Sequence, residues 1–364
     1  MKQAKIAING FGRIGRLFFR SAFAPTPPKS ALGGRRPGKA SADGAGLDIV
    51  AINDLGDLEN LAYLLKYDTV YGRYSKSVRY QVSGIKQSLI VDGKEIKFLQ
   101  IREPAQLPWK DLNIDIAIEA TGLFESYEKA KAHLTAGAKR VVITAPAKDP
   151  DGPDGKTILA GINEGELKTT VLTSNGSCTT NAAAPVIQVM SENPGIEKAV
   201  LNTVHAYTAT QNVVDGPVRG GKDYRRGRAA AQNIVPSTTG AALAVTRVIP
   251  ELNGKFDGVA LRVPIVNGSI ADITFIAKRN VTVEEINEIF RKAAAEPRWQ
   301  GILKVSEDQL VSSDIIGEPY GTIVDLNFTK VVDGNLVKVL SWYDNEAGYV
   351  STLIKHVERV AQLI

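Results

Sequence analysis

The chain contains a single cysteine, Cys178, in a setting that suits a nucleophile. It stands in Ser174-Asn175-Gly176-Ser177-Cys178-Thr179-Thr180-Asn181. The β-branched run 169–173 before it predicts a buried strand, and 179–187 after it predicts the start of a helix. Unpaired backbone N–H groups at a helix N-terminus stabilise a thiolate. We therefore expect a reactive thiolate here in place of an inert buried cysteine.

One of the three histidines is placed to act with this thiol. His205 lies in 199–210, a predicted strand that runs into hydroxyl-rich chain. His133 and His356 fall in the predicted helices 126–136 and 350–364, and we expect both to be surface or partly buried structural residues. With one cysteine and no histidine pair at ligand spacing, we expect no metal site and no zinc-based dehydrogenase.

The N-terminus carries a dinucleotide-binding fingerprint. The alternating segment 4–8 predicts a strand, 17–22 predicts a helix, and a GxGxxG motif joins them. The first glycine permits a tight turn, the second lets the backbone approach a pyrophosphate, and the third lets helix and strand pack closely. The predicted cofactor contacts in this motif are Gly10, Phe11, Gly12, Arg13, Ile14 and Gly15.

A carboxylate about 20 residues further on is expected to bind the cofactor's ribose. The candidate, Asp54, follows the predicted strand 48–53 but lies 44 residues after Gly10. Between them, the segment 24–46 is rich in proline, glycine and alanine, which predicts a flexible insertion between the first helix and the second strand. Without its 23 residues the spacing is 21, as expected. A carboxylate at Asp54 repels a 2′-phosphate, so it indicates NAD over NADP.

Two further predicted strands, 115–120 and 140–143, end in small and hydroxylated residues. Thr121, Gly122 and Thr144 therefore lie where an open α/β sheet receives its cofactor, at the carboxyl ends of the strands. A cysteine nucleophile beside a nicotinamide cofactor suits the oxidation of an aldehyde through a thioester.

Composition sets broad limits on the class of protein. A length of 364 residues predicts two domains, and 44% hydrophobic with 23% charged residues is ordinary for a globular chain. The net charge is +5, of which 24–46 contributes +3, so the rest is close to neutral and we expect no nucleic-acid partner. No apolar run approaches ~18 residues, so we expect no membrane span, and the N-terminus does not resemble a signal peptide. One cysteine fits a reducing compartment, and we expect the cytoplasm.

Seven stretches, in order along nearly the whole chain outside 24–46, together carry a family resemblance. They are Asn9–Arg16, Lys66–Arg73, Ser177–Asn181, His205–Gln211, Arg228–Ala230, Pro236–Gly240 and Trp342–Glu346. On these stretches the chain closely resembles the NAD-dependent, phosphorylating glyceraldehyde-3-phosphate dehydrogenases.

The resemblance implies roles for individual residues. Cys178 corresponds to the nucleophile and His205 to the base that activates it, with the Cys178 backbone N–H and protonated His205 stabilising the oxyanion. The residues implied around the substrate phosphate are Thr208, Thr210 and Arg262. Those implied around the attacking inorganic phosphate are Ser177, Thr179, Arg225, Thr239 and Gly240. Asn345 corresponds to the residue that fixes the nicotinamide carboxamide, and Pro217 to a position associated with NAD preference. One extra residue within 218–222 leaves Arg226 as the alternative to Arg225.

The resemblance also implies an α/β plus α+β fold, in which a Rossmann domain carries an inserted catalytic domain built on a mixed or antiparallel sheet. The expected Rossmann domain spans 1–177 and is completed by the C-terminal helix 346–364, and the expected catalytic domain spans 178–345. The implied assembly is a homotetramer. The implied reaction converts D-glyceraldehyde 3-phosphate and inorganic phosphate to 1,3-bisphosphoglycerate with NAD.

Two alternatives stay open at this point. Erythrose-4-phosphate dehydrogenase shares the fold and the Cys–His pair, although a hydrolytic enzyme has no need of a second phosphate site. A noncatalytic role in nucleic-acid binding predicts a basic face with aromatic platforms, which the near-neutral composition outside 24–46 does not favour.

Overall fold

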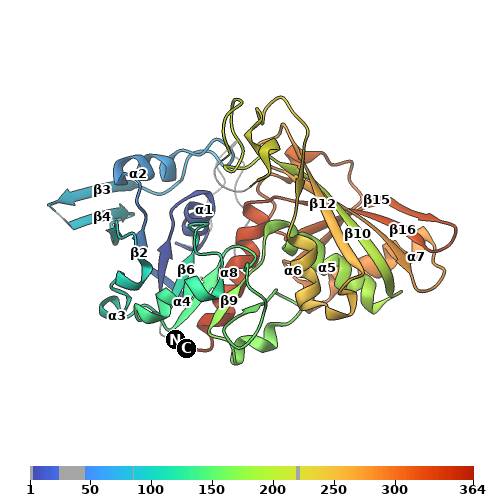
Figure 1. Ribbon diagram of the computed structural model, residues 1–364, viewed down its shortest axis with the longest axis horizontal. Coiled ribbons are helices and arrows are strands. Elements are labelled where there is room, and N and C mark those ends of the chain that lie inside the picture. The colour runs from blue at the N-terminus through green and yellow to red at the C-terminus, as the bar shows by residue number, and fades with distance from the viewer. Residues whose placement is uncertain (1–2, 24–45, 85, 219–221) are drawn as a thin grey trace. The chain divides into compact units, whose positions relative to one another are not determined.

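The computed structural model describes residues 3–23, 46–84, 86–218 and 222–364. The predicted insertion 24–46, apart from Gly46, and residues 219–221 lie outside the described residues. The chain divides into two compact units (Figure 1). The first is Met1–Gly176 with Val350–Ile364, and the second is Ser177–Tyr349.

The described residues of the first unit form a nine-stranded sheet in the order β3-β4-β5-β2-β1-β6-β7-β9-β8. Its strands are β1 (Ala4–Asn9), β2 (Leu47–Asn53), β3 (Val78–Ser83), β4 (Lys86–Val91), β5 (Lys94–Leu99), β6 (Ile116–Glu119), β7 (Arg140–Ile143), β8 (Lys156–Thr157) and β9 (Leu172–Ser174). The pairs from β5 to β8 are parallel, and β3-β4-β5 is antiparallel. All four residues of β6 are buried, as expected for a parallel strand covered on both faces.

Helices connect these strands. They are α1 (Arg13–Ala22), α2 (Leu58–Lys66), α3 (Trp109–Leu112), α4 (Tyr127–Thr135) and α8 (Ala347–Ala361), which enters this unit at Val350. The side chains of Asp57 and Ser126 accept hydrogen bonds from backbone N–H groups of α2 and α4 and so define where these helices begin. In contrast, α1 follows Gly12, which provides no side-chain cap, at the carboxyl end of β1.

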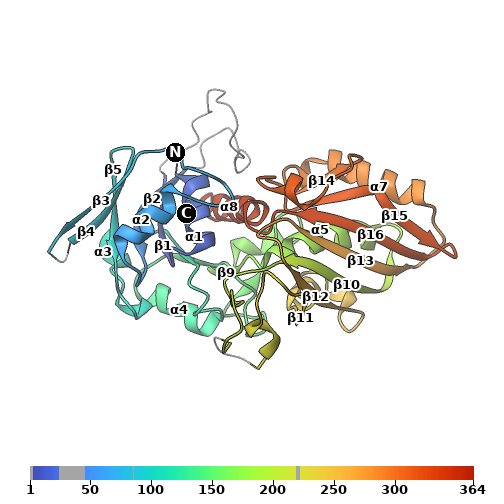
Figure 2. The same ribbon diagram turned by 90° about the horizontal axis from the view of Figure 1, so that it is seen from above.

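The second unit is built on a seven-stranded sheet in the order β11-β12-β10-β13-β16-β15-β14 (Figure 2). Its strands are β10 (Ile196–Ala206), β11 (Val235–Thr238), β12 (Phe256–Val263), β13 (Ser269–Ala277), β14 (Leu303–Ser306), β15 (Thr322–Val332) and β16 (Leu336–Tyr343). The helices α5 (Cys178–Glu192), α6 (Ala241–Val248) and α7 (Val283–Ala295) pack against it. Along β13, buried and partly exposed residues alternate strictly, so one face of the sheet is covered and the other is not.

The predicted fold class is confirmed: a parallel-centred Rossmann sheet is combined with a second, mixed sheet. The local predictions differ in detail. The strand predicted at 169–173 is shifted to Leu172–Ser174, because 164–168 form a 3-10 helix. The helix predicted from Thr179 begins one residue earlier, at Cys178. Among the described residues, none of the helices combines the length and the apolar character needed to traverse a bilayer.

The predicted exposure of two histidines is wrong. His133 is 0% exposed and His356 is 2% exposed, because both occupy the inward faces of their helices. Trp109 Nε1 donates to His133 Nδ1 at 3.0 Å, and Thr173 Oγ1 lies 2.8 Å from His356 Nε2. Hydrogen-bond partners of this kind allow an imidazole to be buried without loss of its polar contacts.

Candidate active site

Cys178, His205 and Arg262 meet within the second unit. Cys178 is the first residue of α5, and His205 and Arg262 are paired in register on the parallel strands β10 and β12. The Cys178 Sγ lies 3.3 Å from His205 Nε2, and Arg262 Nη1 lies 2.6 Å from His205 Nδ1. The three groups therefore form a continuous chain from thiol to guanidinium through one imidazole ring.

The start of α5 is held by a reciprocal cap. Ser177 Oγ accepts from Thr180 N at 3.1 Å, and Ser177 N donates to Thr180 Oγ1 at 3.2 Å. This capping box fixes the entry of the chain into the helix. Cys178 is thereby placed in the first turn, where its sulfur accepts hydrogen bonds from the backbone N–H groups of Cys178 and Thr179.

Tyr343 supports this site from β16, although the sequence analysis assigned it no role. Its hydroxyl lies 2.9 Å from Thr179 Oγ1 and 2.7 Å from Thr203 Oγ1, and its ring meets His205 edge-on at 5.9 Å. The side chain is 1% exposed, and burial raises the pKa of its phenol. Tyr343 therefore acts as a neutral support for Thr179 and His205.

Burial opposes the ionisation of both members of this pair. Burial raises the pKa of the Cys178 thiol, although Arg262 and the N–H groups of α5 oppose this effect. Burial, and then the charge of Arg262, lower the pKa of His205 to about 3. Desolvation penalises both charged forms, whereas the charge of Arg262 and the N–H groups at the start of α5 favour the thiolate. The thiolate at Cys178 and the protonated His205 at the oxyanion stay predictions.

The threonines implied at the substrate phosphate follow β10 directly. Thr208 Oγ1 lies 2.9 Å from Thr210 Oγ1, and both hydroxyls are exposed. Arg262 lies near the carboxyl end of β12, which runs parallel to β10. All three side chains thus come from the same end of one parallel strand pair.

Of the residues implied around inorganic phosphate, several already make local hydrogen bonds. Ser177 and Thr179 are engaged as described above, Thr239 Oγ1 accepts from Ala241 N at 3.2 Å, and Gly240 directly precedes α6. Hydroxyl groups retain acceptor capacity in such bonds, so these contacts are compatible with a further ligand.

Both candidate arginines pair with Asp223, Arg225 at 2.9 Å and Arg226 at 3.5 Å. The side chain of Arg225 is 58% exposed. Arg226 is 30% exposed in its side chain and donates to Ser237 Oγ, on β11, at 2.9 Å. The charge of Arg226 also lowers the pKa of Arg262, with burial as the larger cause. The structure therefore brings Arg226, and not Arg225, toward Arg262.

Two predicted cofactor residues lie in the second unit. Asn345 Oδ1 accepts from Gly268 N at 3.2 Å and from Ser269 Oγ at 2.9 Å. Both bonds end on the amide oxygen, so the amide N–H groups of Asn345 are its donors to a ligand. Pro217 lies in an exposed loop, where its carbonyl accepts from Asn212 Nδ2 at 3.1 Å.

The glycine fingerprint has the geometry that a dinucleotide requires. Gly10 has φ 96°, and a Cβ there would lie 2.6 Å from the Ala120 backbone. A Cβ on Gly15 would lie 2.1 Å from Gly10 O, so helix α1 packs against the turn only without one. A Cβ on Gly12 would meet nothing within 4 Å. Open space above Gly12, at an uncapped helix N-terminus, is the place where a pyrophosphate is expected to bind.

Asp54 lies beside this turn. Its carboxylate accepts from Phe11 N at 2.6 Å and from Gly56 N at 2.8 Å. Arg13, in the first turn of α1, is paired with Asp68 at 2.5 Å. The glycine turn and the Asp54 carboxylate are therefore joined by a direct hydrogen bond. Ile14 follows Arg13 in the first turn of α1.

A buried polar network at the ends of β1, β2 and β6 was missed by the sequence analysis. Glu119 is 3% exposed and accepts from Thr121 N at 2.8 Å, from Asn9 Nδ2 at 2.6 Å and from His133 Nε2 at 2.9 Å. Since the Trp109 indole can only donate, His133 Nδ1 is the acceptor and its Nε2 carries the proton.

The network holds two of the predicted cofactor contacts in place. Thr121 also donates through its hydroxyl to Glu119, and Thr144 donates to the Glu119 carbonyl through its N at 3.0 Å and its Oγ1 at 3.1 Å. Gly122 follows with φ 71°. The sequence alone could have indicated the polar residues at these strand ends. It could not have indicated their partners, which lie on α3 and α4.

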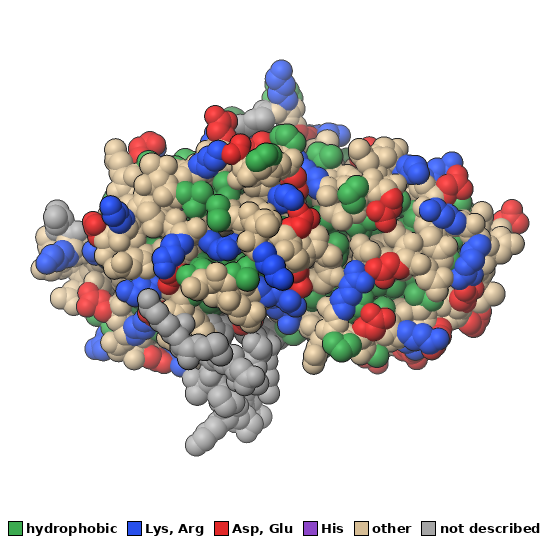
Figure 3. Space-filling view, turned by 90° about the horizontal axis from the view of Figure 1, so that it is seen from below, with side chains coloured by type: hydrophobic (Ala, Val, Ile, Leu, Met, Phe, Trp, Pro, Cys, Tyr) green, Lys and Arg blue, Asp and Glu red, His purple; other side chains and the backbone are tan. Residues whose placement is uncertain are grey.

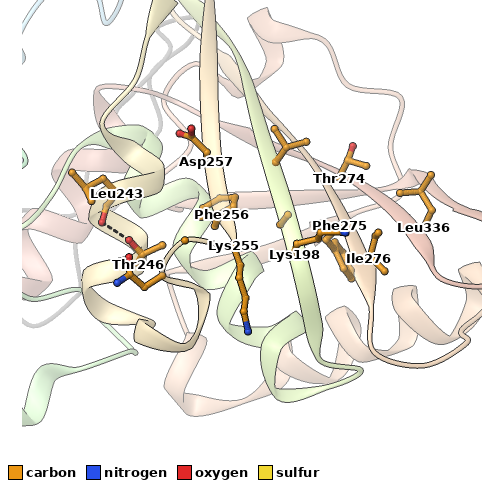
Figure 4. Close-up of a pocket in the computed structure, with 14 residues that line it drawn as sticks. Lys198, Leu243, Thr246, Lys255, Phe256, Asp257, Thr274, Phe275, Ile276 and Leu336 are labelled. Carbon is orange, nitrogen blue, oxygen red and sulfur yellow. Dashed lines mark hydrogen bonds between the residues drawn. The ribbon is translucent and has the colours of Figure 1, made fainter.

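A hollow of about 690 Å³ lies elsewhere in the second unit, between α6 and the strands β10, β12 and β13 (Figure 4). Leu243 and Thr246 border it on one side and Leu336 on the other. Of the described residues that line it, none is a predicted site residue. In the described ranges, no group of three or more His, Cys, Asp or Glu side chains could hold a metal ion.

Comparison with known proteins places this geometry in a family. Residues 4–127 match the profile of the glyceraldehyde 3-phosphate dehydrogenase NAD binding domain, and residues 177–345 match that of the C-terminal domain. The glyceraldehyde-3-phosphate dehydrogenase of Streptomyces coelicolor is 46% identical over 96% of both chains, and that of Clostridium pasteurianum is 45% identical over 99% of both. Glyceraldehyde-3-phosphate dehydrogenase 2 of Bacillus subtilis is 46% identical over 98% of this chain and 97% of its own.

The chain belongs to the glyceraldehyde-3-phosphate dehydrogenase family.

The family profiles cover most of the geometry described above. The range that matches the NAD binding domain includes the glycine turn, Asp54 and Glu119, and the range that matches the C-terminal domain runs from Ser177 to Asn345. Thr144 lies between the two matched ranges. Tyr343 lies within the stretch Trp342–Glu346, although the sequence analysis gave it no role. The alternation of buried and partly exposed residues along β16 was the signal that could have marked its side chain as inward-facing.

Proposed function

We propose that this chain oxidises D-glyceraldehyde 3-phosphate with NAD and inorganic phosphate to give 1,3-bisphosphoglycerate. The observation that carries the proposal is the 3.3 Å contact between Cys178 Sγ and His205 Nε2, in a chain whose relatives bear the name of this activity. We assign cofactor binding to the first unit, because residues 4–127 match an NAD binding domain, and the chemistry to the second unit, because it contains Cys178 and His205.

Catalysis begins at the Cys178–His205 pair. Cys178 Sγ attacks the aldehyde carbon, and the proton of the thiol is held by His205 Nε2. The imidazolium stabilises the negative charge that develops on the carbonyl oxygen and then gives its proton to that oxygen, which yields a thiohemiacetal and an uncharged imidazole. The Cys178 N–H at the start of α5 stabilises the oxygen as negative charge develops on it.

Oxidation and phosphorolysis follow. When bound, NAD supplies a two-electron acceptor for the hydride that leaves the aldehyde carbon. His205 Nε2 takes the hydroxyl proton in the same step, which leaves a thioester on Cys178. A phosphate oxygen then attacks the thioester carbon and the carbon–sulfur bond breaks. The acyl phosphate departs and the thiol regains a proton.

The cofactor is held by groups that the structure already aligns. We propose that the α1 N-terminus at Gly12 binds the pyrophosphate and that Asp54 accepts from the ribose hydroxyls, since its oxygens keep lone pairs beside their two N–H donors. Thr121, Gly122 and Thr144 line the strand ends, and the Asn345 amide donates to the nicotinamide carboxamide.

Two phosphates require two sets of donors. We assign Thr208, Thr210 and Arg262 to the substrate phosphate, and Ser177, Thr179, Thr239 and Gly240 to inorganic phosphate. Because the side chain of Arg225 is 58% exposed, whereas that of Arg226 is 30% exposed and donates to Ser237 Oγ, we assign the arginine of the second set to Arg226. A forked guanidinium suits either anion.

We further propose a homotetramer in the cytoplasm. The uncovered face of the second sheet and the helix bordering it expose Val200 at 52%, Val259 at 53% and Leu243 at 59%. Apolar side chains gathered on one sheet face favour contact with another protein surface, and a second copy is the partner that the family suggests. On the face drawn in Figure 3, acidic and basic side chains of the described residues are interspersed. Sedimentation equilibrium, which gives the mass of the assembly in solution, tests the proposed homotetramer.

The function is tested by NADH formation from glyceraldehyde 3-phosphate and from erythrose 4-phosphate, each with and without inorganic phosphate. We expect turnover of the first aldehyde that depends on phosphate. Faster turnover of erythrose 4-phosphate in the absence of phosphate would overturn the assignment. Replacement of NAD by NADP should lower the rate.

A further inference from the structure

The side-chain amide of Asn345 is held in one orientation by its neighbours. Gly268 N lies 3.2 Å and Ser269 Oγ lies 2.9 Å from the same atom, Asn345 Oδ1. A backbone N–H can only donate, so the amide atom that faces Gly268 must be the oxygen. The amide nitrogen is directed elsewhere, and among the described residues no group accepts a hydrogen bond from it. The side chain is 7% exposed, so Asn345 carries two nearly buried N–H donors.

The hydroxyl of Ser269 links this amide to the strand that carries the base. Ser269 Oγ accepts from Ala206 N at 3.1 Å. Since that N–H supplies its own proton, the hydroxyl proton of Ser269 is left to donate to Asn345 Oδ1. Ser269 is 0% exposed, so bulk water does not compete for either bond. One hydroxyl thereby joins the residue after His205 to the amide of Asn345.

The order of the strands explains why a side chain at this position reaches both groups. β13 lies between β10 and β16 and is antiparallel to both, and Ser269 is its first residue. The neighbouring strands end beside it, β10 at Ala206 and β16 at Tyr343, two residues before Asn345. The beginning of the middle strand is therefore the place where the two neighbouring strand ends can share a hydrogen-bond partner.

The backbone next to Asn345 is fixed by a different group. The carboxylate of Asp344, which is 0% exposed, accepts from Glu346 N at 2.8 Å and from Ala347 N at 2.7 Å. These bonds hold the main chain but do not restrict rotation of the Asn345 side chain. The orientation of its amide therefore depends on the donors to its oxygen, of which Ser269 makes the shorter contact.

We propose that Ser269 is a positioning residue, which turns the N–H groups of Asn345 toward the carboxamide of the bound nicotinamide. A half-turn of the amide would place its NH2 group against the Gly268 N–H and would leave the Ser269 hydroxyl without its acceptor, which disfavours the reverse orientation. Loss of the hydroxyl removes one of the two groups that oppose this half-turn. The proposal rests on the proposed function and adds to it the residue that orients a cofactor contact.

The test compares two ligands of the full-length protein by calorimetry. ADP-ribose carries the adenosine, the pyrophosphate and the second ribose of NAD but lacks the nicotinamide ring. Ser269→Ala should raise the Kd for NAD by about three- to tenfold, the value of one hydrogen bond, and should change the Kd for ADP-ribose by less than about twofold. An unchanged Kd for NAD, or equal losses for both ligands, would overturn the proposal.

Two further variants separate this role from a merely structural one. Ser341→Ala is the matched control, because it removes another buried serine hydroxyl of the same sheet, one that contacts Thr322 Oγ1. It should leave the Kd values for both ligands within about twofold of those of the unmodified protein. Ser269→Cys is nearly isosteric and provides a second readout if Ser269→Ala folds poorly. A thiol is a weak donor, so NAD should again weaken relative to ADP-ribose, and an unchanged ratio would refute the proposal.

A double-mutant cycle tests whether Ser269 acts through Asn345. In an Asn345→Ala background, Ser269→Ala should raise the Kd for NAD by less than about twofold, because there is no amide left to orient. An undiminished effect would overturn the proposal. NADH formation from glyceraldehyde 3-phosphate is measured on the unmodified protein. Its absence while NAD still binds would refute the proposed function, whereas normal NADH formation without the expected changes in Kd would refute the role of Ser269 alone.

Discussion

His356 should make the stability of this protein depend on pH. Its ring lies in the interior of the first unit, with Nδ1 3.2 Å from the Ile158 carbonyl and Nε2 2.8 Å from Thr173 Oγ1. A carbonyl can only accept, so Nδ1 carries the proton and Nε2 accepts from Thr173. Burial of this neutral ring lowers the pKa of His356 from 6.5 to about 4. The perturbation is His356→Gln, which removes the titrating group.

The sign and the size follow from linkage. Between pH 6.5 and about 4 the unfolded chain binds a proton at His356 that the folded chain does not, so acid favours unfolding. The contribution of the neutral ring is fully present above pH 6.5 and is lost as the pH falls through this window. Each pH unit is worth about 1.4 kcal/mol, which gives about 3 kcal/mol over the window. That is a large share of a typical unfolding free energy of about 5–15 kcal/mol.

The assay is urea unfolding followed by pulse proteolysis, at fixed protein concentration, from pH 8 to pH 4. His356→Gln should lose less stability between pH 6.5 and 4 than the unmodified protein, by about 3 kcal/mol. Thr173→Val is the matched control, since it removes the hydrogen bond to Nε2 but keeps the imidazole. It should lower stability at every pH by ~1 kcal/mol and preserve the slope. Equal slopes for His356→Gln and the unmodified protein would refute the reasoning.

Three further predictions concern the site. Cys178→Ser should abolish NADH formation while NAD affinity stays within about twofold, because a hydroxyl ionises far less readily than a thiol; turnover above a few per cent would exclude Cys178 as the nucleophile. Asp54→Ala should lower the ratio of kcat/KM for NAD over NADP by about tenfold or more, since repulsion of the 2′-phosphate is relieved; an unchanged ratio would mean that another residue contacts the ribose. Glu119→Gln should cost ~2–4 kcal/mol of stability and weaken NAD binding in calorimetry, because its amide would face the donors that now bind the carboxylate. The control Glu125→Gln, which opens only a pair with exposed Lys148, should change stability by less than about 1 kcal/mol, and equal losses would contradict the special role of Glu119.

Patterns within short stretches of the sequence were enough to predict much of the fold and of the candidate site. The strand–turn–helix around Gly10 and Gly15 follows from local periodicity and from backbone positions that exclude a side chain. Cys178 at a helix start and His205 at a strand end follow from the same kind of signal. The resemblance supplied Arg262 and Asn345, which no local pattern marks as functional.

Other features depend on which distant segments meet. The position of Arg262 against His205 Nδ1 is decided by the register of two parallel strands whose paired residues lie 57 positions apart. Whether Arg225 or Arg226 points toward Arg262 depends on how a short 3-10 helix rests against β11. The partnership of Glu119 with His133 and Trp109 requires α3 and α4 to pack below the ends of β1 and β6.

The sequence by itself determined the chemical groups, their order along the chain and the class of fold, since these depend on residue type and on spacing within single elements. The tertiary structure decided the surroundings of those groups. A helix N-terminus alone favours a thiolate at Cys178, but burial of the same residue opposes this effect and raises the pKa of its thiol. Desolvation depends on all the atoms packed around a group, and those atoms come from strands and helices far apart in the sequence.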